Sequence, residues 1–196
     1  MRYLFARHGE SEFSVRGLLN GDTTVPGGLT SAGVAQARRL GAALAEEPLA
    51  LCVTSELQRT RETADLALDG RDVPRLVLPG LNDPLYGRFE GRSLAEYRAW
   101  AASVPSSALP GRGGESRRAI VDRYVGAFRR LLERHETTVL VVAHSLPIAY
   151  LVAARRGMAP ERRMPLVPYA RPDPFERAEL ERASSVLEQW LAEPTW

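Results

Sequence analysis

Hydrophobic residues along the chain follow two alternating patterns: short continuous runs, and longer segments with helical spacing. Four short runs are predominantly apolar, at residues 1–6, 49–54, 75–78 and 138–143. Continuous apolar runs of this length are typical of strands that are buried on both faces of a parallel sheet. The pattern therefore predicts four β-strands, and Thr138–Ala143 has the strongest β propensity of them.

Helical spacing of apolar residues fills most of the sequence between these strands. Val34, Ala37, Leu40 and Leu44 recur at three- and four-residue intervals, for example, and Pro48 ends that segment. The predicted helices span residues 29–47, 55–68, 93–100, 115–135, 147–156 and 173–191.

Capping signals support several of these helix starts. A Ser, Thr or Asp before the first helical turn satisfies free backbone N–H groups, and an acid or amide three residues later completes a capping box. Such signals occur at Thr30 or Ser31, at Ser55 with Gln58, at Ser93 with Glu96, and at Asp173, Pro174 and Glu176.

Strands that alternate with helices predict an α/β protein. We expect a single domain over residues 1–196, with three α/β/α layers and a mostly parallel central sheet. The segments at residues 14–28, 79–92, 104–114 and 158–172 are rich in Gly, Pro and Ser and are predicted to be loops. In open parallel sheets, ligands bind beyond the carboxyl ends of the strands, so this edge is where functional residues are expected.

Composition narrows the class of protein. The chain is 44% hydrophobic and nearly balanced in charge, at +2, and all of its basic residues other than histidine are Arg. The Arg residues are interleaved with acids, so no basic stripe of the nucleic-acid-binding type is present. No apolar run is long enough to span a membrane, and the first residues lack a signal-peptide pattern, so we expect a cytoplasmic protein. The lone Cys52 has no disulfide partner.

Polar residues suited to chemistry follow each predicted strand. His8 follows the first, Ser55 and Arg59 the second, Asp83 the third and His144 the fourth. Because the carboxyl ends of parallel strands meet at one edge, we expect these side chains to lie close together.

These residue types fit phosphoryl transfer. Arg7 and Arg59 offer guanidinium donors that match phosphate oxygens, with His144 as a third donor. The imidazole of His8 can attack phosphorus and then leave again. The segment around His8 is also compatible with an ordinary strand-to-loop turn, in which the imidazole pairs with Glu10. Asp83 is the candidate acid for the leaving oxygen, although Asn-Asp-Pro is equally a common turn sequence.

Aromatic residues in the loops admit two interpretations. They could line an apolar entrance to the site, or simply pack in the core, and core packing is the commoner role for any one of them. The residues concerned are Phe13, Tyr86, Phe89, Tyr97 and Tyr169.

The order of the motifs resembles the histidine phosphatase superfamily, in its phosphoglycerate mutase-like branch. The similar blocks run from residue 1 to about residue 150. They are Arg7-His8-Gly9-Glu10-Ser11, Arg16-Gly17 with Asn20-Gly21, Leu29-Thr30-Ser31-Ala32-Gly33 with Gln36-Ala37, Ser55-Glu56-Leu57-Gln58-Arg59 with Thr63-Ala64, Leu81-Asn82-Asp83 with Gly87 and Phe89-Glu90-Gly91, Gly113-Gly114-Glu115-Ser116, and the strand ending in His144.

The resemblance implies a role for each matching residue. His8 is then transiently phosphorylated, and Arg7, Arg59 and His144 hold the phosphate. Asn20 and Gly21 stand where the family makes further phosphate or substrate contacts, and Asp83 stands where it carries the acid–base carboxylate. The family needs no metal or other cofactor, and the three separated His residues give no metal-ligand spacing.

Three positions depart from the family pattern. Asp83 occupies a position that is usually Glu, Ser14 one that is usually Asn, and Ser145 one that is often Gly. Asp83 is one methylene shorter, so its loop must come closer or it works less well on some leaving groups. Ser14 and Ser145 remain candidate substrate-binding residues, and the side chain of Ser145 would narrow the pocket.

The sequence therefore predicts a metal-independent phosphatase for a small-molecule phosphomonoester. The first alternative is a phosphoglycerate mutase, but the mutases of the family are generally longer, with an insertion that shields the site from water. The second alternative is a catalytically weak binding or regulatory member. We expect no nucleic-acid partner and no membrane partner. The sequence indicates neither which phosphomonoester is bound nor the oligomeric state.

Overall fold

The computed structural model describes all residues from Met1 to Trp196. A five-stranded sheet with the strand order β3-β2-β4-β1-β5 forms its centre. Strands β1 to β4 run parallel, whereas β5 pairs with β1 in the antiparallel direction. The strands are β1 (Arg2–Arg7), β2 (Leu51–Thr54), β3 (Arg75–Val77), β4 (Thr138–Ala143) and β5 (Pro172–Glu176).

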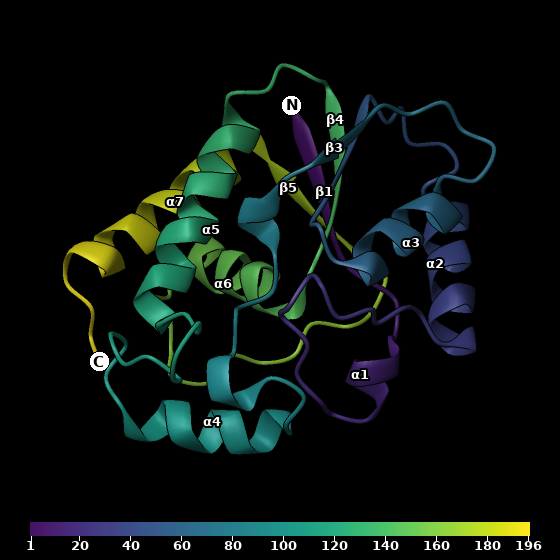
Figure 1. Cartoon of the computed structure of the whole chain (residues 1–196). Helices are drawn as coiled ribbons and strands as arrows, with labels where there is room; N and C mark the ends of the chain where they lie inside the picture. Colours follow the sequence, from purple (N-terminus) through teal and green to yellow (C-terminus); the bar gives the residue numbers. More distant parts are fainter.

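Helices cover both faces of this sheet, as Figure 1 shows. Helices α2 and α3 pack on one face, and α5, α6 and α7 on the other. The helices are α1 (Glu12–Val15), α2 (Ser31–Ala43), α3 (Gln58–Ala67), α4 (Leu94–Ser103), α5 (Arg117–Leu132), α6 (Ser145–Arg155) and α7 (Arg177–Ala192), with 3₁₀ turns at Pro79–Leu81 and Gly87–Phe89. The predicted α/β class with a mostly parallel sheet is confirmed.

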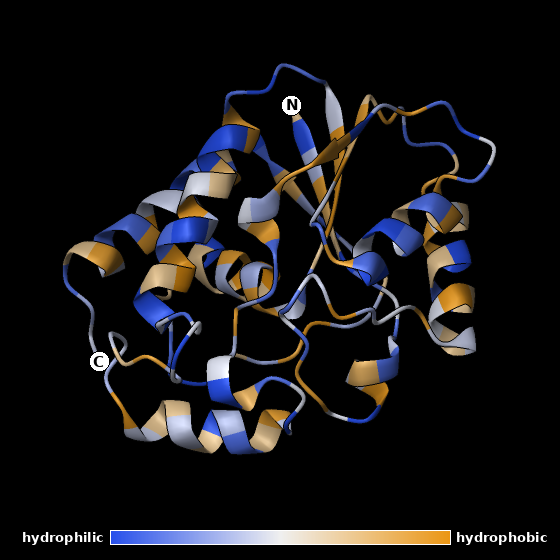
Figure 2. Cartoon of the chain, viewed as in Figure 1, coloured by the Kyte–Doolittle hydropathy of each residue, from blue (hydrophilic) through white to orange (hydrophobic).

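Alternation along the strands divides the core into two parts. Tyr3 and Phe5 of β1 point toward α5–α7, whereas Leu4 and Ala6 point toward α2 and α3. Both sets are almost fully buried, which explains why β1 is apolar at successive positions and not only at every second one. The flanking helices carry orange and blue residues together in Figure 2, the mixture expected of helices with one buried and one solvated face.

The last predicted helix begins later than its sequence pattern indicates. Asp173 and Pro174 lie in strand β5, and α7 begins at Arg177 with Glu176 as its cap. Successive N–H groups of a strand point to opposite sides, so Pro172 and Pro174 lack theirs on one side only, which an edge strand tolerates. Pairing with β1 therefore places Asp173 and Pro174 in a strand, although their sequence is typical of a helix start.

A second correction concerns the start of α3. The predicted capping box at Ser55 and Gln58 does not form, because α3 begins at Gln58 with Leu57 at the cap position and no side-chain cap. The helices α2 and α5 are shorter than predicted, whereas α4 continues to Ser103 and α6 begins at Ser145. Thr30 and Ser93 cap α2 and α4 as predicted, and Ser116 caps α5. Helix α1, which was not predicted, has Ser11 at its cap.

None of the helices is both long and apolar enough to cross a lipid bilayer. The loops beyond the carboxyl ends of β1–β4, together with α1 and α4, gather at the lower edge of the molecule in Figure 1. The pocket described next lies at that edge.

Candidate active site

The five predicted catalytic side chains lie together. Hydrogen bonds and close contacts join four of them, His8, Arg59, Asp83 and His144, and Arg7 lies beside this group. The pocket that Arg7, His8, Arg59 and Asp83 line encloses about 950 Å³, including its open mouth. The rings of His8 and His144 lie with their centroids 5.2 Å apart at its base. We call Arg7, His8, Arg59, Asp83 and His144 the phosphate end of the pocket, after the chemistry that the sequence predicts for them.

His8 is held in one orientation and one tautomer. Its backbone N–H donates to the carbonyl of Ala143, which fixes the residue at the end of β1 beside β4. The ring Nδ1 lies 2.7 Å from the carbonyl oxygen of Gly9. Because a carbonyl oxygen can only accept, Nδ1 carries the proton and Nε2 carries the lone pair. Nε2 accepts a hydrogen bond from Arg59 Nε at 3.2 Å, which agrees with this assignment.

The environment keeps His8 uncharged. Burial, followed by the nearby charge of Arg59, lowers the pKa of His8 well below its ordinary value of 6.5. A neutral imidazole with its lone pair directed into the pocket has the form that a nitrogen nucleophile requires.

Helix packing explains why residue 9 is a glycine. A Cβ at this position would lie 2.6 Å from the carbonyl oxygen of Gly33 in α2. The Gly9 N–H donates to Thr63 of α3, so both helices on this face contact the turn after β1. The glycine of the first motif thus allows another backbone to approach closely.

Arg59 is fixed by nearly all of its donors. Nη1 donates to Asn20 Oδ1 at 2.8 Å, and Nη2 donates both to the Asn20 carbonyl at 2.9 Å and to Asp83 Oδ2 at 2.7 Å. Asn20 is 6% exposed and lines the pocket, so it positions the guanidinium from the loop after α1. Arg59 itself stands in the first turn of α3, as the sequence predicted.

His144 lies beneath the pocket at the end of β4, and its two ring nitrogens have different surroundings. Nε2 lies 2.9 Å from Ser55 Oγ. Nδ1 is buried, has no hydrogen-bond partner in the protein, and lies 3.4 Å from Asp83 Oδ2. Burial and then the charge of Arg59 lower the pKa of His144 well below 6.5, so a charged His144 needs a bound anion to support it.

Arg7 is also positioned to bind an anion. Its guanidinium lies 3.8 Å from the centroid of the Tyr169 ring, and Nη1 donates to the Val167 carbonyl at 2.8 Å. Nε is buried without a partner. The segment at residues 164–169, which sequence patterns left irregular, is therefore what holds Arg7 in place.

The four predicted substrate-binding residues differ in their placement. Ser14, Asn20 and Ser145 line the pocket, whereas Gly21 does not. Ser14 Oγ takes part in the cap of α1, and Ser145 Oγ accepts from the Val167 N–H at 2.9 Å. The Gly21 N–H donates to Glu90, and a Cβ there would lie 1.8 Å from the Pro84 carbonyl oxygen. Substrate contacts by these residues stay predictions.

Sequence reasoning missed two residues of the site and gave a third a second role that it does not have. Ser55 was placed at the functional edge by its position after β2, but it was also interpreted as a helix cap, and no such cap forms. Arg98 and Arg117 line the pocket but occur in ordinary amphipathic helix patterns, which gave no signal. Phe13, Tyr86, Tyr97 and Tyr169 do line the pocket, and Phe89 packs behind them in a small cluster with Tyr97.

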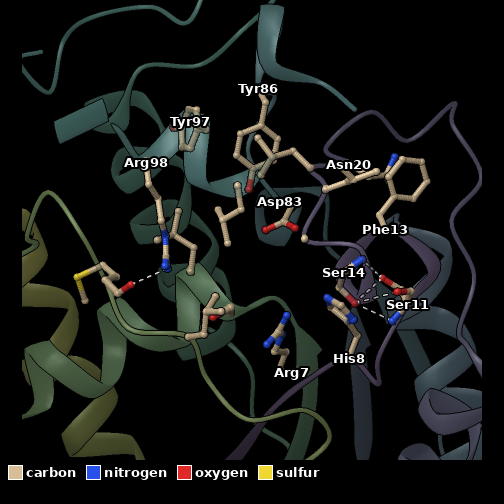
Figure 3. A pocket seen from close by; sticks show the side chains of 18 of the residues that line it. Arg7, His8, Ser11, Phe13, Ser14, Asn20, Asp83, Tyr86, Tyr97 and Arg98 are labelled. Carbon is tan, nitrogen blue, oxygen red and sulfur yellow. Dashed lines mark hydrogen bonds between the residues drawn. The ribbon is translucent and has the colours of Figure 1, made fainter. Parts of the chain in front are cut away.

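The pocket has two chemically different sides, which Figure 3 shows. His8 and Ser14 lie on one side of the opening, and Tyr97 and Arg98 lie across from them with Tyr86 and Asp83 between. The structure brings no three His, Cys, Asp or Glu side chains into an arrangement that could hold a metal ion.

Several proteins with known names are similar in sequence to this chain over most of its length. The adenosylcobalamin/alpha-ribazole phosphatase of Salmonella typhimurium is 33% identical over 165 residues, which cover 78% of each chain. A 2,3-bisphosphoglycerate-dependent phosphoglycerate mutase of Methylobacterium is also 33% identical, covering 81% of this chain and 82% of the relative. The crystal structure of the alpha-ribazole phosphatase of Shigella flexneri superposes with a TM-score of 0.76 at 29% identity, covering 90% of both chains.

These similarities confirm the predicted phosphoglycerate mutase-like fold and agree with the prediction of a phosphoric monoester hydrolase. The sequence model of the histidine phosphatase superfamily (branch 1) matches residues 3–171, which extends beyond the segment where motifs could be recognised by eye. The chain therefore belongs to the histidine phosphatase superfamily, branch 1.

Proposed function

We propose that this protein hydrolyses a small-molecule phosphomonoester through a phosphohistidine formed on His8. The observation that carries the proposal is the hydrogen bond from His8 Nδ1 to the Gly9 carbonyl, which leaves the lone pair on Nε2 beside the guanidinium of Arg59. A nucleophile is thereby held next to donors for the oxygens of the phosphate it attacks.

In the first step, His8 Nε2 forms a bond to phosphorus as the ester P–O bond breaks. The alcohol oxygen leaves with the bonding electrons and takes a proton from Asp83, which must enter this step as the neutral acid. Arg7, Arg59 and His144 Nδ1 donate to the non-bridging oxygens, whose charge they stabilise.

The phosphorylated imidazole carries a positive charge, since Nδ1 keeps its proton. The Gly9 carbonyl oxygen, 2.7 Å from Nδ1, stabilises this charge. In the second step a water molecule attacks phosphorus and gives its proton to the Asp83 carboxylate, while the N–P bond breaks and returns its electrons to Nε2. Inorganic phosphate leaves, and both residues regain their starting forms.

The substrate class rests on the pocket and the relatives. Concave sites whose lining area is mostly apolar, with a few polar groups, usually bind small molecules, so a phosphorylated metabolite fits better than a phosphoprotein. The names of the relatives make α-ribazole phosphate the first compound to test. A cytoplasmic location stays a prediction from the sequence.

A mutase activity is the second candidate, and it is favoured by the mutases among the relatives. A mutase must return the phosphate to bound product before water takes it. Only residues 104–116 join α4 to α5, which is a short connection for a shield over the phosphoenzyme.

The test is an assay of purified protein with a chelator present throughout. The panel contains nitrophenyl phosphate, α-ribazole phosphate, sugar and nucleotide phosphates, and 3-phosphoglycerate with and without 2,3-bisphosphoglycerate. Phosphate release that disappears in His8→Ala supports the proposal, as does an acid-labile, alkali-stable phosphoenzyme in rapid-quench samples. Conversion of 3- to 2-phosphoglycerate without phosphate release would identify a mutase, and a folded protein that turns over no compound would indicate a binding function.

A further inference from the structure

The side of the pocket across from His8 is lined by two arginines that have no acidic partner. We call Arg98, Arg117, Tyr97 and the segment 164–166 the distal end of the pocket; all of them line it. No ion pair in the structure includes Arg98 or Arg117. Arg98 Nη2 donates to the Met164 carbonyl at 2.9 Å, the bond drawn in Figure 3.

Arg117 is the more unusual of the two because it is only 7% exposed. Its Nη1 donates to Tyr150 Oη at 3.0 Å, its guanidinium carbon lies 5.4 Å from the centroid of the Tyr97 ring, and its Nε has no hydrogen-bond partner. Buried charges in proteins are normally paired. Arg59, which is 3% exposed, follows that rule through its ion pair with Asp83. Arg7, which is 8% exposed, is in no ion pair but belongs to the phosphate end, where an anion is its expected partner.

Buried nitrogens without a partner occur at both ends of the pocket. The structure has three such side-chain atoms: Arg7 Nε, His144 Nδ1 and Arg117 Nε. The first two belong to the phosphate end, where an anion is their expected partner. The Tyr86 hydroxyl is influenced by charges from both ends: after burial, the charge of Asp83 raises its pKa, and the charge of Arg117 opposes this.

The net positive charge of the side chains that line the pocket also exceeds the charge that one phosphate can balance. Four guanidinium groups and a single carboxylate face it. A phosphomonoester dianion at the phosphate end therefore leaves at least one cation unbalanced, even while Asp83 is ionised, and that surplus lies at the distal end. The lining also has an apolar part, which includes Leu19, Leu94, Leu146 and Tyr86, and Figure 3 shows Tyr86 between the two sides.

Resting on the proposed function, we infer that the preferred substrate carries a second anionic group, such as a carboxylate or another phosphate, separated from the phosphomonoester by an apolar or planar segment and bound by Arg117 and Arg98. A charge-assisted hydrogen bond to a buried guanidinium is strong. When the anion is missing, the guanidinium charge stays buried without a partner, which costs free energy. The distal end thus selects the substrate without touching the reacting atoms.

The experiment compares matched phosphomonoesters. Each ω-carboxyalkyl phosphate in a series of increasing length is paired with the ω-carbamoyl compound, which has the same shape and no charge. The wild-type protein should prefer the carboxylate at one length by about 10- to 100-fold in kcat/KM, mainly through KM. In Arg117→Met and Arg98→Met this preference should disappear, while the carbamoyl compound keeps its rate within about threefold. Arg117→Lys, which retains a charge, should keep part of the preference.

Arg155→Met is the matched control, because Arg155 also lies over an aromatic ring, that of Phe175, but outside this pocket. Inhibition by inorganic phosphate should be unchanged in every variant, which shows that the phosphate end is intact. If Arg117→Met does not fold, Arg98→Met gives the same test from a half-buried position.

The inference is overturned if the wild-type protein shows no preference at any length, or if both distal variants slow the two members of a pair equally. These outcomes differ from failure of the proposed function, in which none of the compounds would release phosphate in a manner that depends on His8.

Discussion

The two ends of the pocket are built from different parts of the chain and by different means. At the phosphate end, Arg7, His8 and His144 lie at the ends of β1 and β4, and Arg59 and Asp83 come from α3 and the loop after β3. Arg59 and His8 are each held by hydrogen bonds to the backbone or to neighbouring side chains. The distal end comes from α4, α5 and the segment before β5, and its guanidinium groups lack acidic partners. The contrast suggests that the rigid sheet edge performs the chemistry, while the added helices and loops choose the substrate.

Removing the nucleophile is the most severe test of this division. His8→Ala should lower kcat by about 10⁴-fold or more for every substrate, whether or not it carries a second anion, because no other group can form the phosphoenzyme. Steady-state assays on nitrophenyl phosphate and on the best metabolite measure this loss. His135→Ala, at an exposed histidine, is the control and should have no effect. Activity near that of the wild type would remove His8 from its proposed role.

The acid position should give a loss that depends on the leaving group. In Asp83→Asn we expect kcat to fall by about 10²- to 10³-fold for alkyl phosphates but by less than about tenfold for nitrophenyl phosphate, whose leaving oxygen barely needs a proton. The comparison of the two kcat values within one variant is the measurement, with the exposed Asp69→Asn as control. Equal losses on both substrates would mean that Asp83 positions Arg59 but does not donate the proton.

Ser55 offers a milder test of the phosphate end. Ser55→Ala removes the oxygen that lies 2.9 Å from His144 Nε2 and should lower kcat/KM by about tenfold, because Nδ1 is then less well oriented toward phosphate. The loss should be the same for carboxylate and carbamoyl substrates, unlike the losses in the distal variants. A selective loss on the carboxylate compound would break the separation between the two ends. Ser107→Ala, on the surface, is the control.

The two ends should also differ in how they respond to pH. Burial lowers the pKa values of His8 and His144 below 6.5 in the folded protein, so below that pH the unfolded chain binds protons that the folded protein does not. The free energy of unfolding should therefore fall as the pH drops through about 6.5, by at most about 1.4 kcal/mol per pH unit for each histidine. Thermal unfolding between pH 7.5 and 5.5 measures the slope.

His8→Ala should flatten this slope, whereas Arg98→Met should leave it unchanged, because an arginine does not titrate in that range. An unchanged slope in His8→Ala would indicate that His8 is already protonated in the folded protein at pH 6.

Treatment with a chelator should have the smallest effect. Guanidinium and imidazole groups supply the positive charge at both ends, so activity on every substrate should stay within experimental error after dialysis against EDTA. Loss of activity that returns with a divalent cation would place a metal in the reaction, and comparison of the two substrate types would then locate it at one end.

Local sequence patterns predicted the phosphate end well because strand ends have a local signature. An apolar run followed at once by a polar residue marks the carboxyl edge of a parallel sheet, and this pattern located Ser55 and His144, with His8 one position further on. Asp83 was found in the loop that follows the third strand. The same patterns misassigned Ser55 as a cap, since capping spacing does not show whether a distant imidazole competes for the hydroxyl. They also extended the last helix into β5, because pairing with β1 is a contact between opposite ends of the chain.

The distal end illustrates what sequence patterns leave open. Arg98 and Arg117 are two arginines among many, and in a helix an arginine at the boundary of the apolar face usually reaches solvent. Only the packing of α4 and α5 around the rings of Tyr97 and Tyr150 buries Arg117 and directs it to the pocket. The same holds for Arg7, whose orientation depends on Val167 and Tyr169, far away in the sequence.

The sequence by itself thus determined the α/β class, the edge of the sheet at which the pocket lies and the polar residues that gather there, because each of these follows from neighbours within a few positions along the chain. Their catalytic roles stay predictions. The tertiary structure alone decided which nitrogen of His8 faces the pocket, what holds Arg59 and His144, and which arginines lack a partner. These features depend on desolvation and on hydrogen bonds between distant segments, and such interactions exist only after the chain has packed.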